Sequence, residues 1–187
     1  AKFQMKGSNW RFRAVSRLEI NTATYKPLKG KSWIPLPPEL AAKKAVINMK
    51  NEDDECFKWC VTRALNPVEK NSERITEELR EQAIKLNWNG IEFPVPVDEN
   101  VINKFEKNNK VSVNVFGYDG NVYPLILSKH ESEKLIDLLL ISEGERKHYC
   151  WIKNFNKLCA ERTETGHHTM HYCKRCLNGY SYIEGLD

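Results

Sequence analysis

The chain has 187 residues, which is enough for one domain with a substantial hydrophobic core and a small appendage. It is 41% hydrophobic and 29% charged, with a formal net charge of +4, as in an ordinary globular protein. No apolar run approaches the roughly 20 residues of a membrane-spanning helix, and no secretory signal pattern opens the chain, so we expect no membrane partner. The mild positive charge permits a nucleic-acid surface without requiring one.

The six cysteines do not have the spacing of a disulfide scaffold, because residues 61–149 contain none of them. The chain also has enough Trp, Leu, Ile and Val to form a core without covalent cross-links. We therefore expect free and metal-bound thiols, and a cytoplasmic or nuclear location.

The first 45 residues predict a strand followed by an irregular arm. After a loose start over residues 1–9, apolar and small residues alternate with polar ones through residues 10–20, which favours a β-strand. Four prolines then argue against regular structure, at positions 27, 35, 37 and 38. Residues 46–48 predict a short extended piece.

Three helices are expected next. In residues 56–65 a stripe of residues repeats at helical spacing (Phe57, Cys60, Val61, Ala64), and Asn66-Pro67 ends it. Residues 72–88 predict a second helix with Ser72 as N-cap. Residues 99–109 predict a shorter amphipathic helix on Val101 and Phe105.

The pattern then changes to a run of strands. Valines alternate over residues 110–117, and a turn signal follows at residues 118–121. Further apolar runs cover residues 122–128, 134–142 and 148–155. Helices followed by strands predict an α+β fold, with the helices on one side of a mostly antiparallel sheet.

The stretch DDECFKWC places Cys56 at the start of the first of these helices. A thiolate at a helix N-terminus is stabilised by the helix dipole, so Cys56 is a candidate nucleophile. His148 is the candidate base, and either Asp53 or Asn154 would orient its imidazole. Backbone amides from Asp54 through Glu55 to Cys56 would form the oxyanion pocket.

These residues resemble the ovarian-tumour-type (OTU) cysteine proteases. The resemblance covers residues 46–156 and rests on Asp-x-x-Cys, KFEKNNKVSVNVF, YPLIL and the His-Tyr pair at 148–149. It implies a papain-like fold and a cysteine protease or isopeptidase, a class that includes deubiquitinases. The substrate would be ubiquitin or a ubiquitin-like protein, and catalysis would need no cofactor. Asp54 replaces the family's usual glycine, and Cys150 replaces its polar orienting residue.

A second resemblance spans residues 10–186. YKPLKGKSWIPLPPEL, HYCWIKNFNKL and HYCKRCLNGY are similar to the region before the exonuclease and polymerase domains of Maverick/Polinton protein-primed B-family DNA polymerases. This implies a mobile-element or virus-like origin. The alternative function is then a non-catalytic accessory module that binds nucleic acid or protein. A third reading is a catalytically inactive binder of ubiquitin-like proteins.

The last segment, residues 159–187, reads as a partial C2H2-type zinc-finger tail after a core over residues 46–158. Cys173 and Cys176 have the spacing of the first pair of zinc ligands. The second pair would follow Leu186, beyond Asp187, or be replaced by upstream residues (His167, His168, His171, Cys159). The alternative is a tail with two free thiols.

Basic residues near this motif alternate with aromatic ones, which indicates either a nucleic-acid surface or a solvated face. The basic residues are Lys147, Lys153, Lys157, Arg162, Lys174 and Arg175, and the aromatic ones are Trp151, Phe155 and Tyr172. Cys60 reads as core packing, and His130 as a solvated turn residue.

Overall fold

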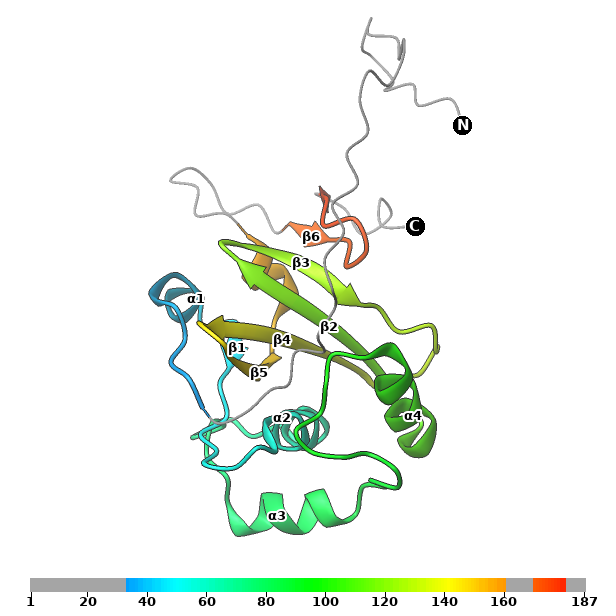
Figure 1. The fold of residues 1–187 in the computed structure, drawn as a ribbon. Helices are drawn as coiled ribbons and strands as arrows, with labels where there is room; N and C mark the ends of the chain where they lie inside the picture. The colour runs from blue at the N-terminus through cyan, green and yellow to red at the C-terminus, as the bar shows by residue number, and fades with distance from the viewer. Residues whose placement is uncertain (1–32, 161–169, 181–187) are drawn as a thin grey trace, which may run out of the picture.

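A computed structural model of the chain describes residues 33–160 and 170–180 (Figure 1). The strand expected over residues 10–20 and the part of the proline-rich arm before Trp33 lie outside these residues. Within them, a five-stranded sheet and five helices form the body, and a small two-stranded sheet lies beside it. No helix among the described residues is both long and apolar enough to cross a membrane.

The main sheet has the strand order β1-β5-β4-β2-β3. Its strands are β1 (Val46–Ile47), β2 (Ser112–Asp119), β3 (Asn121–Ile126), β4 (Leu135–Glu143) and β5 (Arg146–Ile152). Neighbouring strands are antiparallel except for β2 and β4, which are parallel. The two hairpins turn at Gly120 and Gly144, both with positive φ, which glycine adopts without steric cost. The expected α+β fold with a mostly antiparallel sheet is therefore confirmed.

Helices cover both faces of this sheet. On one face lie α2 (Cys56–Leu65), α3 (Glu77–Ile84) and α4 (Glu99–Asn109), and α2 lies between the sheet and α3 (Figure 1). On the other lie α1 (Pro38–Lys43) and α5 (Phe155–Cys159). The prediction of helices on one side was wrong, because β2 and β4 are buried on both faces and both faces need cover.

The two faces carry separate clusters of buried side chains. The α2-side core includes Phe57, Phe105, Val113, Leu138 and Tyr149. The α5-side core includes Leu40, Phe116, Leu139, Ile141 and Phe155. In the first, the ring of Phe57 meets those of Phe105 and Tyr149 edge-on, with centroids 5.3 and 5.4 Å apart. Each such pair adds about 1 kcal/mol beyond burial, so α2, α4 and β5 are fixed together.

Three local predictions need correction. Pro38 starts a helix, because the first helical position needs no backbone N–H donor. The second predicted helix begins at Glu77 and not after Ser72, since the Thr76 side chain caps it by accepting the Leu79 N–H at 3.3 Å. The last predicted strand ends at Ile152, and Asn154 caps α5.

Candidate functional site

The loop before α2 is organised by the Asp53 carboxylate. Its two oxygens accept the indole N–H of Trp59 at 3.1 and 3.0 Å, and Oδ1 also accepts the Glu55 N–H at 3.0 Å. The Asn51 side chain donates to the same carboxylate and to the Asp53 carbonyl. Asp53 therefore fixes the start of α2, as a capping group does, and its described hydrogen bonds do not include an imidazole.

Cys56 is the first residue of α2, as predicted, and it is fully buried. Its sulfur lies against the backbone amide of Tyr149 in β5. Burial raises the pKa of the Cys56 thiol from 9.0 to about 12, and the amides of Tyr149 and Phe57 oppose this only in part. In this conformation the thiol is protonated at neutral pH.

Cys60 lies one helical turn further along and faces the same residue of β5. Its thiol donates to the Tyr149 carbonyl at 3.1 Å. β1 pairs with β5 only at Trp151 and Ile152, and at Tyr149 the two thiols of α2 contact the β5 backbone. Burial also raises the pKa of Cys60 and of Cys150 well above the usual value. The three thiols thus form a buried cluster, which confirms Cys60 as core packing.

His148 is fully buried in β5, one residue before Tyr149. Side chains alternate along a strand, and Tyr149 belongs to the α2-side core with Cys56. Ile141, the partner of His148 across the ladder, belongs to the α5-side core. The backbone thus directs the His148 side chain toward the face that α1 and α5 cover. The pairing of Cys56 with His148 stays a prediction.

The remaining predicted site residues have local structural partners. Asn154 accepts the Lys157 N–H at 2.9 Å as the N-cap of α5, and the strand that would have aligned it with His148 ends before it. In the predicted oxyanion loop, the Glu55 amide already donates to Asp53, and Asp54 is exposed. Lys58 pairs with the Glu55 carboxylate at 2.8 Å.

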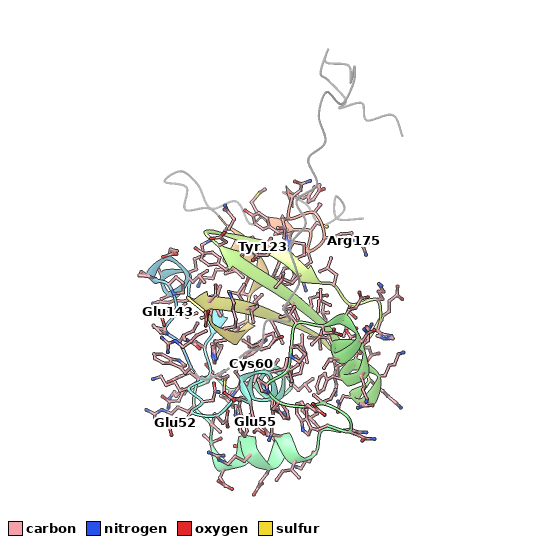
Figure 2. All side chains as sticks on the ribbon, in the orientation of Figure 1. Glu52, Glu55, Cys60, Tyr123, Glu143 and Arg175 are labelled. Carbon is pink, nitrogen blue, oxygen red and sulfur yellow. The ribbon has the colours of Figure 1, made fainter. Side chains whose placement is uncertain are left out.

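A cavity of about 560 Å³ lies beside this loop. Its walls are Lys50, Glu52, Asp53, Arg74, Ile75 and Arg80. Cys56 is not among the lining residues, so this hollow gives no access to the thiol. Glu52 is exposed and Glu55 is half-buried; Figure 2 labels both near the start of α2, whereas Cys60, on α2, is fully buried.

A second candidate site lies on the opposite side of the sheet. Strands β6 (His171–Tyr172) and β7 (Gly179–Tyr180) form a hairpin whose connecting turn carries Cys173 and Cys176. Both cysteines are free thiols. Among the residues that the structure describes, no three His, Cys, Asp or Glu side chains are grouped to hold a metal. His167 and His168 lie outside those residues.

The basic residues near this hairpin are only partly available to a ligand. Lys174 pairs with Asp137 at 2.6 Å, and Phe155 is buried in the α5-side core. Lys153, Lys157 and Arg175 are exposed, and Arg175 projects from the side of the sheet away from Cys60 (Figure 2). Arg162 lies outside the described residues. The surface is therefore basic but lacks the aromatic contribution that was expected of Phe155.

One pair of polar residues was not recognised from the sequence. Glu106 of α4 is 2% exposed, and its Oε1 accepts the Val113 N–H of β2 at 2.7 Å. The ring of His130 lies 3.8 Å from its other oxygen. The sequence feature that could have identified Glu106 as a buried polar residue was its position next to Phe105, on the buried side of α4. His130 is partly exposed, as expected of a turn residue.

In comparisons with known proteins, no family model, no curated protein and no solved structure matches this chain.

Proposed function

We propose that this domain is a non-catalytic accessory module that binds nucleic acid, in a mobile-element or virus-like replication protein. The resemblance to the region preceding Maverick/Polinton polymerase domains supports the context. The exposed basic residues support nucleic acid as the ligand.

The observation that carries this proposal is the segregation of charge along the chain. Residues 33–143 hold 19 acidic and 14 basic residues, whereas residues 1–32 hold eight basic residues and one acidic residue. Residues 144–187 hold seven basic and five acidic residues, and Lys153, Lys157 and Arg175 are exposed there. A net-acidic body with basic segments before and after it favours phosphate contacts through those segments.

The burial and the raised pKa of Cys56 favour this proposal over an enzymatic function. A cysteine nucleophile must reach its substrate and must form thiolate near neutral pH. Cys56 is fully buried, and burial raises its pKa to about 12. Its sulfur contacts the backbone amide of Tyr149 inside the core, as a structural thiol does.

The test is a titration of fluorescein-labelled DNA, single-stranded and duplex, followed by anisotropy at several salt concentrations. We expect binding that weakens steeply with salt, and a variant with Lys153→Gln, Lys157→Gln and Arg175→Gln should bind less tightly at every salt concentration. Each lost phosphate contact lowers the magnitude of the log–log salt slope by about 0.9 for duplex DNA.

A matched control removes the same charge from the acidic body. Lys70, Lys85 and Lys107 are exposed, and their replacement by Gln should change affinity much less. Equal effects of the two triple variants, or no binding at low salt, would contradict the proposal. Cys56→Ala should bind DNA like the unaltered protein.

A thiol hydrolase of the OTU type is the second candidate. It is favoured by one observation, that the Cys56 sulfur contacts the amide of the residue that follows His148. Incubation with ubiquitin carrying an electrophilic C-terminus tests it. A covalent adduct that both Cys56→Ala and His148→Ala abolish would support the hydrolase. Absence of an adduct would leave the nucleic-acid-binding module as the proposed function.

A further inference from the structure

The connection between β3 and β4, residues 127–134, is fixed beside α4 and the start of β2 (Figure 1). The hydroxyls of Ser112 and Ser128 donate to the His130 carbonyl at 2.6 and 3.2 Å, and the His130 N–H donates back to the Ser128 hydroxyl at 3.1 Å. These bonds hold the backbone of His130 and bring its ring to the side of α4 where Glu106 lies.

Glu106 places a carboxylate here with one oxygen fixed and the other without a donor. Its side chain is 1% exposed, and Oε1 accepts the Val113 N–H at 2.7 Å. Oε2 is buried and accepts no hydrogen bond from the residues that the structure describes. Nε2 of His130 lies 3.8 Å from it, which is too far for a hydrogen bond. Because a buried carboxylate oxygen without a donor is costly, this arrangement favours a ligand that donates to it.

Two adjoining cavities lie beside His130. The first, of about 250 Å³, has Glu106, His130 and Glu131 in its wall. The second, of about 520 Å³, shares His130 and Glu131 and adds Glu133 and the exposed side chain of Leu135. A ligand can therefore extend from Glu106, past His130, along an apolar side chain.

The charges around these cavities favour a cation. Three carboxylates line them, those of Glu106, Glu131 and Glu133. Lys107 and Lys110 line only the first cavity; both are exposed, and neither donates to Oε2 of Glu106. An anion would be repelled by the buried carboxylate, whereas an ammonium group supplies both a positive charge and N–H donors.

We propose that this site binds the primary ammonium group of an aliphatic amine. The ammonium donates to Oε2 of Glu106, and the alkyl chain lies against Leu135 in the second cavity. Within the described part of the chain no hydrogen bond holds the His130 ring, so the ring can rotate away from Oε2 to admit the ligand. This site goes beyond nucleic-acid binding and does not rest on it.

The test uses 1,5-diaminopentane, titrated into the full chain and followed by calorimetry and by the NMR shift of the Val113 amide, which contacts Glu106 directly. We expect saturable binding of one equivalent. The analogue with both nitrogens fully methylated has the same charges and no N–H donors, and it should bind at least about tenfold more weakly. This comparison uses the unaltered protein, so it does not depend on a variant that folds.

Glu106→Gln keeps an acceptor for the Val113 N–H and should weaken diamine binding by a similar factor. Glu81→Gln, a matched control at an exposed position of α3, should leave the affinity unchanged. Equally tight binding of Nα-acetyl-lysine methylamide would identify the ligand as a lysine side chain of a polypeptide, and much weaker binding would identify a free amine.

Three results would each overturn the proposal: no binding of the diamine, equal binding of its methylated analogue, or an unchanged affinity in Glu106→Gln. Inorganic phosphate that shifts the Val113 amide as strongly as the diamine does would also overturn it. Glu106→Gln should bind DNA like the unaltered protein, so failure of this site and failure of nucleic-acid binding are distinguishable.

Discussion

The burial of Cys56 makes a quantitative prediction about its reactivity. Iodoacetamide reacts with the thiolate, and at pH 7.5 a thiol with a pKa of 9.0 is about 3% ionised. With the pKa of about 12 that burial gives Cys56, the ionised fraction falls by three powers of ten. Cys56 in the folded protein should therefore react on the order of 10³-fold more slowly than the same cysteine in the unfolded chain.

The assay follows each cysteine by peptide mass spectrometry after quenching alkylation at increasing times. The same reaction in concentrated urea provides the reference rate for every site. A catalytic cysteine would behave in the opposite way, because its thiolate is stabilised at neutral pH. Cys159, which is half-buried with a pKa of about 11, serves as an intermediate standard within the same chain.

Alkylation of Cys56 in the folded state at a rate equal to or above its rate in urea would refute the reasoning. It would mean that the thiol is exposed and ionised in solution, and it would restore the hydrolase as the leading function. A slow Cys56 that accelerates only under unfolding conditions would assign it to the structural cluster with Cys60 and Cys150.

Three further predictions concern side chains that hold the fold in place. Because folding raises the pKa of Cys56, the contribution of this thiol to the free energy of unfolding is present below pH 9 and is lost as pH rises toward 12. Between pH 8.0 and 10.5, urea unfolding should therefore show that the unaltered protein loses about 2 kcal/mol more of its free energy of unfolding than Cys56→Ala loses. Glu106→Ala should cost about 2 kcal/mol by leaving the Val113 N–H without its acceptor, whereas Glu106→Gln should retain most of the stability; equal losses in the two would contradict this. Asp53→Ala should cost roughly 1–2 kcal/mol by removing the acceptor of the Trp59 indole, and Asp53→Asn should cost less, both measured by thermal unfolding.

The sequence was a good guide to elements whose periodicity is local. The helix that starts at Cys56, the amphipathic helix over residues 99–109 and the strands from residue 112 onward are all present. In each, side-chain spacing matches the repeat of a single element, so no distant contact is needed to specify it. The cap at Thr76 was missed because Ser72 offers the same chemistry, and only the hydrogen bond to Leu79 distinguishes them.

Long-range contacts decided the candidate site. The sequence established that Cys56 begins a helix, and a helix N-terminus favours thiolate; the tertiary structure then placed that sulfur under β5, where burial has the larger effect. Asp53 and Asn154 have the right side chains for a catalytic role, and each has instead a nearby donor, Trp59 and the Lys157 amide.

For the cysteine pair at 173 and 176, the two-residue spacing could be recognised from the sequence, and the structure places both residues on the turn between β6 and β7; zinc binding there stays a prediction. Whether a thiol is buried or exposed depends on what packs over it. The sequence therefore determined which residues could bind or react, and the packing of α2 against β5 decided that Cys56 is held as a protonated thiol.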